Sequence, residues 1–314
     1  MTDLLAFGAA VLELTPPDRE RLETTDQLNL AATGPAVNTA VAAARLGGDA
    51  AWLSKLPDTA LGRRIVAELG SHGVETTVKW TDEGRQALAF AERAGSPRGN
   101  TRIDDRTASA VASATPEELP LSVIGSPEMV FVDAALPARS ATLADTATTL
   151  FAEAGDAGTE TVLGFGREEP SAATVEAVEG VLPTVDTLIA AEAGTAALGD
   201  RANPTETAHA LAAEHDLETV VIVRDEHGGV VWNDRTVHER APPATETIDD
   251  RGAFDAFCGG FLARRAAGED AGTALAAGVA SEALARTVPG PVPVITPEEL
   301  ERCVESIAES GTIE

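Results

Sequence analysis

The sequence is poor in the residues that mark secreted, membrane-spanning or zinc-stabilised proteins. Its two cysteines, Cys258 and Cys303, lie far apart without histidine neighbours, so neither a disulfide framework nor a structural zinc site is expected. No run approaches the roughly 20 apolar residues that a membrane helix needs. The start, MTDLLAFG, lacks the basic residues and the cleavage site of a signal peptide. These absences favour a cytoplasmic protein without a membrane partner.

Lysine is also scarce, and the chain is strongly acidic. It has 51 acidic residues against 23 basic ones, a net charge of −28, and Lys55 and Lys79 are its only lysines. Such a field repels phosphate backbones and anionic lipids, which disfavours binding to nucleic acids or membranes. The acidic residues recur along the whole chain, which is typical of a halophilic surface whose charges molar salt screens within about 3 Å. An acidic protein of ordinary salt requirement is the alternative.

Strand and helix patterns alternate along most of the 314 residues. Apolar residues make up 44% of the chain, as in a packed protein. The alternation predicts one α/β domain over residues 1–314, with a mostly parallel sheet covered by helices on both faces. The expected strands are 4–14, 50–57, 128–136, 159–166, 185–193, 217–225 and 228–234. The expected helices are 36–48, 61–73, 141–155, 171–182, 205–216, 252–268, 271–286 and 296–309.

Two polar segments, approximately residues 13–33 and 85–106, interrupt this alternation. Polar and apolar residues alternate over short stretches in both segments, and neither has a strong helix pattern. This indicates a small β insertion. In open α/β proteins the ligand crevice lies at the carboxyl ends of the strands. A β insertion at that edge would serve as a lid.

The strongest candidate site is the segment ETIDDRGAFDAFCGGF. Gly252 and Ala253 open a helix, whose free N–H groups and positive dipole end favour an anion. Asp255 lies in the first turn of that helix, where a carboxylate can act as general base on a hydroxyl while the N–H groups stabilise a transferring phosphoryl group. The alternative is an ordinary acidic residue at a helix N-terminus.

A second candidate is TGPAVNTAVAAARLGG, where Thr33, Gly34 and Pro35 form a tight turn. Asn38 falls at the start of the following helix, within reach of a polar ligand. The alternative is a loop and an asparagine that only caps its own helix.

Together these segments resemble the two signatures of the ribokinase-like (PfkB-type) carbohydrate kinases. TGPAVNTAVAAARLGG is similar to the first signature, usually GG-x-x-x-N before a helix ending in ARLG, and RGAFDAFCGGF to the second, usually T-G-A-G-D-x-F-x-x-G-F. The resemblance covers residues 4–300 and is closer to the 2-keto-3-deoxygluconate kinase branch. It implies a three-layer α/β/α fold with a small β lid, and a homodimer or larger assembly. It also implies ATP and Mg²⁺ as cofactors and a sugar or sugar acid as substrate.

The resemblance also implies roles for individual residues. Asp255 matches the general base, Gly252 and Ala253 match the anion hole, and no residue is assigned to the metal. The positions implied to bind substrate are Gly34, Asn38, Arg106 and Arg167. Those implied to lie at the nucleotide are Phe254, Gly228 and Gly229. An arginine fork suits a carboxylate, although each arginine could instead form a surface ion pair.

The departures from the family pattern fall where chemistry is expected. Phe254 replaces a glycine of the phosphate turn, and Arg251 stands where threonine or asparagine is usual. The chain has no tyrosine, and Ala89 and Asp104 match the sugar-contacting tyrosines of the branch. Further changes are Ala191 and Gly194 in place of N-x-x-E, and Glu226, His227, Gly228 and Gly229 at the nucleotide loop. Two hypotheses remain: a kinase with an altered nucleotide site, and a catalytically impaired paralogue that binds a sugar acid or regulates a partner.

The charge predicts that folding requires molar salt, because a compact chain carrying −28 repels itself when unscreened. We expect the melting temperature to rise by many degrees between low salt and molar KCl. Thermal melts across that range test this. A flat melting temperature would contradict the halophilic interpretation.

Overall fold

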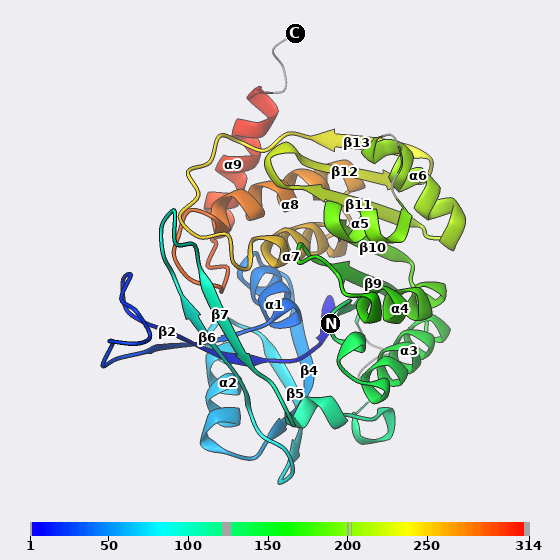
Figure 1. Ribbon diagram of the computed structural model, residues 1–314. Helices are drawn as coiled ribbons and strands as arrows, with labels where there is room; N and C mark the ends of the chain where they lie inside the picture. Colours follow the sequence, from blue (N-terminus) through cyan, green and yellow to red (C-terminus); the bar gives the residue numbers. More distant parts are fainter. Residues whose placement is uncertain (1, 121–126, 200, 202, 311–314) are drawn as a thin grey trace.

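A large, mostly parallel sheet forms the centre of the molecule in the computed structural model, which describes residues 2–120, 127–199, 201 and 203–310 (Figure 1). Within these residues the sheet has nine strands in the order β13-β12-β11-β10-β9-β8-β1-β4-β5. Only the pairs β11–β12 and β12–β13 are antiparallel. The strands are β1 (Leu4–Phe7), β4 (Ala50–Pro57), β5 (Glu75–Thr81), β8 (Met129–Asp133), β9 (Glu160–Phe165), β10 (Thr187–Ala191), β11 (Thr219–Arg224), β12 (Gly228–Asn233) and β13 (Thr236–Arg240).

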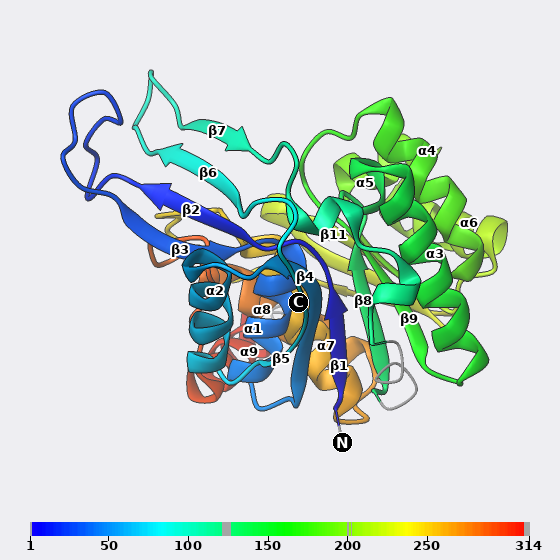
Figure 2. The same ribbon diagram turned by 90° about the horizontal axis from the view of Figure 1, so that it is seen from below.

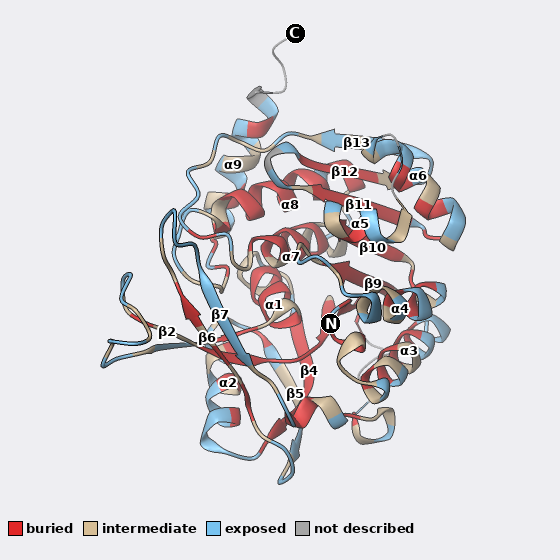
Figure 3. Ribbon diagram, in the orientation of Figure 1, coloured by how far each residue is buried: buried red, intermediate tan, exposed pale blue. Residues whose placement is uncertain are grey.

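Helices cover both faces of this sheet, as the alternation predicts (Figure 2). One layer contains α1 (Pro35–Arg45), α2 (Ala60–Ser71), α7 (Ala253–Ala266), α8 (Ala271–Ala285) and α9 (Pro297–Ser310). The other contains α3 (Ala141–Asp156), α4 (Ala172–Val181), α5 (Glu192–Gly199) and α6 (Pro204–His215). Each layer has its own apolar core, because alternate residues of every central strand point to opposite faces (Figure 3). The expected three-layer α/β/α fold is confirmed.

Local sequence explains where the helices begin. Ser140 caps α3 by accepting a hydrogen bond from the N–H of Leu143 (3.1 Å). Asp270 caps α8 by accepting from the N–H groups of Gly272 and Thr273 (2.9 and 3.1 Å). Each cap satisfies donors that have no partner within the helix.

The two polar segments supply a separate four-stranded sheet in the order β3-β2-β6-β7. Its strands are β2 (Val11–Thr15), β3 (Asn29–Thr33), β6 (Ala87–Glu92) and β7 (Thr101–Asp105). This sheet projects from the main one beside α2 (Figures 1 and 2). Hereafter it is called the lid sheet.

The prediction of one strand over residues 4–14 is wrong. The chain leaves the main sheet after Phe7 and enters the lid sheet at Val11. Gly8 lies at the change of sheet, packed so closely against Ala36 of α1 that a side chain would overlap it. Both halves of the segment are buried, so its apolar run gives no indication of where the change occurs.

Three elements of the main domain were not expected from the sequence. They are the edge strands β5 and β13, whose exposed residues break the apolar pattern, and the short helix α5. Both cysteines are free. Among the described residues, no helix combines the length and apolar character needed to span a bilayer.

Helices α1 and α7 pack against each other at a point where neither has room for a larger residue. A Cβ atom on Gly259 of α7 would overlap that of Ala42 and would lie 2.7 Å from the carbonyl oxygen of Thr39, both on α1. Protein interiors are packed at crystal-like density, so this contact fixes the distance between the helices. It also brings their N-termini to the same side of the sheet.

We expect Gly259→Ala to lower the free energy of unfolding by about 1–3 kcal/mol, because the extra methyl group forces α1 and α7 apart. The matched control is Gly155→Ala, at an exposed helical position where an added Cβ meets nothing within 4 Å. That control should be neutral or stabilising by up to about 1 kcal/mol. Denaturant melts in molar KCl measure both, and equal effects would contradict the close-packing argument.

Candidate active site

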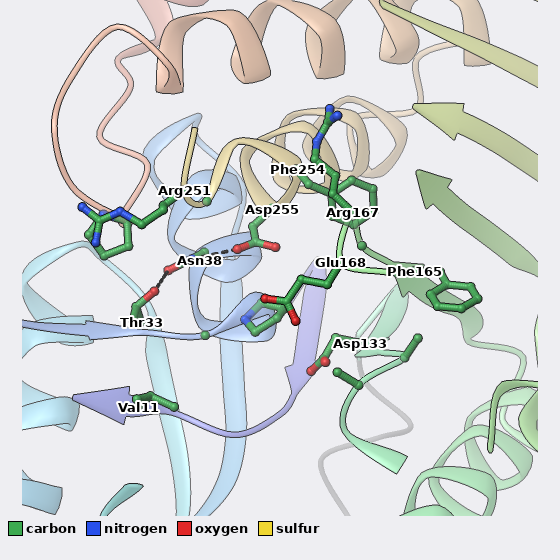
Figure 4. A pocket seen from close by; sticks show the side chains of 18 of the residues that line it. Val11, Thr33, Asn38, Asp133, Phe165, Arg167, Glu168, Arg251, Phe254 and Asp255 are labelled. Carbon is green, nitrogen blue, oxygen red and sulfur yellow. Dashed lines mark hydrogen bonds between the residues drawn. The ribbon is translucent and has the colours of Figure 1, made fainter. Parts of the chain in front are cut away.

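A cavity of about 410 Å³ lies where the carboxyl ends of β8 and β9 face the lid sheet and the N-termini of α1 and α7 (Figure 4). This is the edge at which ligands bind in open α/β folds. The predicted site residues that line it are Gly34, Asn38, Arg106, Arg167, Gly252, Phe254 and Asp255. The structure thus brings together segments more than 200 residues apart in the sequence.

A chain of hydrogen bonds joins the two candidate motifs. Asn38 Nδ2 donates to Asp255 Oδ2 (2.7 Å), and Thr33 Oγ1 donates to Asn38 Oδ1 (3.1 Å) (Figure 4). Gly34 begins α1 at φ 150°, and a side chain there would overlap the carbonyl of Ala9. The amide of Asn38 therefore orients Asp255, which the alternative of a simple helix cap does not require.

The start of α7 is shaped to accept an anion. Gly252 has a left-handed backbone (φ 71°), and a Cβ there would overlap the carbonyl oxygen of Pro291. The buried Ala253 follows as the first helical residue. The N–H of Ala253 donates to the carbonyl oxygen of Asp250 (3.3 Å), whereas the following first-turn N–H groups have no partners within the helix. The helix dipole adds positive potential at this end. Gly252, Phe254 and Asp255 of this turn all line the cavity.

Burial raises the pKa of Asp255 to about 7. The hydrogen bond from Asn38 opposes this shift, whereas the nearby carboxylates of Asp133 and Glu168 add to it. A carboxylate that titrates near neutral pH can both accept and release a proton under physiological conditions.

The two predicted substrate arginines line the cavity, and both are paired with acids. Arg106 Nε donates to Asp104 Oδ1 (2.7 Å) at the end of β7. Arg167 follows β9 and contacts the buried Glu282 of α8 and the exposed Asp225 after β11. The ion pairs do not remove either arginine from the cavity wall.

Arg251, where the family pattern has threonine or asparagine, connects the lid sheet to the turn before α7. It donates to Asp249 through Nε and Nη2 (3.0 and 2.7 Å) and through Nη1 to Glu13 of β2. Glu13, 1% exposed, also accepts from Arg102 of β7. Arg93, just beyond β6, approaches Asp249 at 3.2 Å. The turn before α7 therefore contacts β2 through Glu13 and the end of β6 through Arg93, while Arg102 joins β7 to β2.

Of the three predicted nucleotide-binding residues, only Phe254 lines the cavity. Phe254 is 8% exposed, packs beside Gly166 and forms part of the cavity wall as well as of the core. Gly228 and Gly229 begin β12, and the described residues that line the cavity do not include them. The side chain of Glu226 lies outside the described part of the structure.

The two positions matched to tyrosines differ in their surroundings. Ala89 is buried in the lid sheet beside Val11 and Ala87. Asp104 forms ion pairs with Arg102 and Arg106. Ala191 ends β10, and Gly194 in α5 packs against the ring of Phe165.

Seven charged residues of the cavity were not singled out from the sequence, namely Glu13, Arg102, Asp133, Arg139, Glu168, Glu169 and Asp250. Asp133 ends the buried strand β8, and a polar residue at the carboxyl end of a parallel strand is a usable indication of a site. Glu13 and Arg139 carry no comparable signal, since they belong to a polar segment and to a short turn.

The acidic side chains do not form a protein-only metal site. Among the described residues, no group of three or more His, Cys, Asp or Glu is placed to hold a metal ion. Magnesium keeps several waters and usually binds through one or two carboxylates together with substrate phosphates. The carboxylates that line the cavity are oxygen donors of the kind that such a magnesium ion accepts.

The sequence is similar to those of known carbohydrate kinases. Residues 1–298 match the model of the pfkB family of carbohydrate kinases. The chain is 42% identical over 305 residues to 2-dehydro-3-deoxygalactonokinase of Haloferax volcanii, covering 96% of each chain.

Solved structures show the same fold. The 2-dehydro-3-deoxygluconokinase of Thermotoga maritima superposes with a TM-score of 0.88 at 22% identity, covering 97% of this chain and all of that one. A putative ribokinase II of E. coli, in complex with ATP and Mg²⁺, also gives a TM-score of 0.88, at 17% identity and with 98% of this chain and all of that one covered.

Because the pKa of Asp255 is raised in the folded protein, we expect the free energy of unfolding to depend on pH. The folded protein holds this proton up to about pH 7, whereas the unfolded chain releases it near pH 4. Stability from this group is therefore complete below about pH 4 and is lost as pH rises to about 7. We expect Asp255→Asn to be more stable than wild type by about 1–3 kcal/mol at pH 8, and the gap to shrink at pH 5.

Denaturant melts in molar KCl at several pH values measure this gap. The control is Asp145→Asn, an exposed residue of α3, which should track wild type throughout. A gap for Asp255→Asn that stays constant between pH 5 and pH 8 would show that Asp255 has an ordinary pKa.

Proposed function

Because the chain belongs to the pfkB family of carbohydrate kinases, we propose that it transfers the terminal phosphate of ATP to a hydroxyl of a 2-keto-3-deoxy sugar acid. The observation that carries the proposal is the position of Asp255, hydrogen-bonded to Asn38 and beside the anion-accepting start of α7 in one cavity. The relative from Haloferax volcanii acts on such an acid by name and matches almost the whole chain. That similarity supports the choice of substrate class.

The proposed reaction begins with Asp255 as general base. Its carboxylate accepts the proton of the acceptor hydroxyl, and the oxygen then attacks the terminal phosphorus of ATP, so that the bond to ADP breaks. Asn38 holds the carboxylate in place by its hydrogen bond. The pKa near 7 keeps a large fraction of Asp255 deprotonated at neutral pH while leaving it basic enough to accept the proton.

The start of α7 would stabilise the charge that develops on the transferred group. Its first-turn N–H groups at Phe254 and Ala253 are the donors proposed for the terminal phosphate, and the N–H of Ala253 would then exchange its long hydrogen bond to Asp250 (3.3 Å) for the phosphate. Mg²⁺ would be held by the phosphates of ATP and by water and would neutralise their charge. Gly228 and Gly229 remain proposed nucleotide contacts, although they lie outside the cavity wall.

The acceptor side of the site is proposed to use Gly34, Asn38, Arg106 and Arg167, covered by the lid sheet. The ion pair of Glu13 with Arg251 supports such a cover, because it holds the lid sheet against the turn before α7. Water would then be excluded from the cavity when the substrate is bound.

We also propose that the protein is cytoplasmic and pairs through the outer face of the lid sheet. Strand register places Leu30, Leu14, Phe90 and Ile103 in one row across all four strands. This row lies opposite the cavity, because Leu14 follows the cavity-lining Glu13. Leu30 is 37% exposed and Ile103 54% exposed. An apolar row of this kind is stabilised when a second copy covers it.

We expect Asp255→Asn to abolish phosphoryl transfer while leaving the fold intact, because the amide cannot accept the proton but can still accept the hydrogen bond from Asn38. ADP release by purified protein in molar KCl, with ATP and a panel of sugars and sugar acids, measures turnover. Asp145→Asn is the control and should retain wild-type turnover.

Full turnover by Asp255→Asn would contradict the proposed role of Asp255. Wild-type protein that shows no turnover, yet gains thermal stability with a sugar acid, would instead support the impaired-paralogue hypothesis.

A further inference from the structure

Arg139 differs from the other arginines of the cavity. It ends the short turn Pro137–Arg139 after β8, and its half-buried side chain lines the cavity. Its Nε atom is shielded from solvent and has no hydrogen-bond partner, a property that it shares with the Nε atom of Arg167. Within the described part of the chain, no acid lies within ion-pair distance of its guanidinium.

Each of the remaining cavity arginines has at least one acidic partner. Arg102 and Arg251 share Glu13, Arg106 is paired with Asp104, and Arg167 is paired with Glu282 and Asp225. Leaving a half-buried cation without a partner is unfavourable in the free protein, because desolvation weakens its hydration without replacing it. Burial accordingly lowers the pKa of Arg139. A bound anion would supply the missing partner.

The position of Arg139 suits one end of an extended acid. Arg139 and Asp255 line the same cavity, and the carboxylates of Asp133 and Glu168 influence both side chains. In a 2-keto-3-deoxy acid the hydroxyls on C4, C5 and C6 are at least three carbons from the carboxylate. A substrate with a hydroxyl at Asp255 therefore places its carboxylate at another part of the cavity wall, which includes Arg139.

The negative charge of the protein and of its cavity favours a free cation at the place where an anionic acceptor binds. The protein carries −28, and the cavity wall includes the acids Asp133, Glu168 and Asp255, which repel an anionic acceptor. An arginine fork that is not already occupied gives two parallel hydrogen bonds to a carboxylate and offsets this repulsion.

We propose that Arg139 binds the carboxylate of the acceptor and thereby selects sugar acids over neutral sugars. The inference rests on the proposed sugar-acid kinase function and adds a specificity-determining residue to it.

The test compares 2-keto-3-deoxygluconate and 2-keto-3-deoxygalactonate with 3-deoxyfructose, a neutral analogue with a hydroxymethyl group in place of the carboxylate. We expect Arg139→Gln to raise KM for the acids about 10- to 100-fold, with kcat and the neutral analogue little affected, since a charge-assisted hydrogen bond is lost. Arg139→Lys keeps the charge but not the fork, so its effect should be intermediate. The control is Arg302→Gln, at an exposed position of α9, which should match wild type.

The outcomes separate this inference from the function on which it rests. A wild-type protein that phosphorylates the neutral analogue in preference to both acids would contradict the sugar-acid function itself and Arg139 with it. Wild-type preference for an acid that persists in Arg139→Gln and Arg139→Lys would overturn only the role of Arg139.

Titration calorimetry without ATP gives a second reading that needs no turnover. We expect the acid to bind wild type more tightly than Arg139→Gln by at least about tenfold, with Arg139→Lys in between. Equal Kd values for wild type and a folded Arg139→Gln, checked by its thermal melt, would overturn the inference.

Discussion

The close contact between α1 and α7 determines the geometry of the cavity. With glycine at 259, the two helices approach until their small residues touch, and their N-termini then open on the same space. At that separation the amide of Asn38 reaches Asp255 at 2.7 Å. A wider spacing would leave Asp255 without its donor and would displace the first turn of α7. The base, its orienting amide and the anion-accepting turn thus depend on one packing contact.

Charge is distributed very differently at the surface and in the cavity. The chain as a whole carries −28, yet five arginines gather at the cavity wall. Most of them hold the structure together, as Arg251 does by joining Glu13 of the lid sheet to Asp249 before α7. Buried pairs of this kind fix geometry more reliably than they add stability. An acidic protein can accept an anionic substrate if its few cations are concentrated where that substrate binds.

The sequence was sufficient to predict the fold and to predict that the two motifs form one site. It was not sufficient to predict the contacts around that site. Alternation of buried strands with helices predicts the layers, because each element must cover one face of the sheet. Asn38 and Asp255 could be named because each follows a glycine turn at a helix start. Three features could not be predicted: the change of sheet at Gly8, the unpaired Arg139 and the ion pairs of Arg251. They depend on which distant segments of the chain become neighbours, and the local sequence pattern does not specify those contacts.

The central claim is that burial between α1 and α7 gives Asp255 a pKa suited to a base at neutral pH. Carbon-13 NMR of protein labelled at the aspartate carboxyl carbons tests it directly, with the Asp255 signal assigned by its loss in Asp255→Asn. The account predicts a titration midpoint near pH 7. It also predicts a higher midpoint in Asn38→Ala, because the hydrogen bond from Asn38 favours the charged form. A midpoint near pH 4 that does not respond to Asn38→Ala would contradict the account.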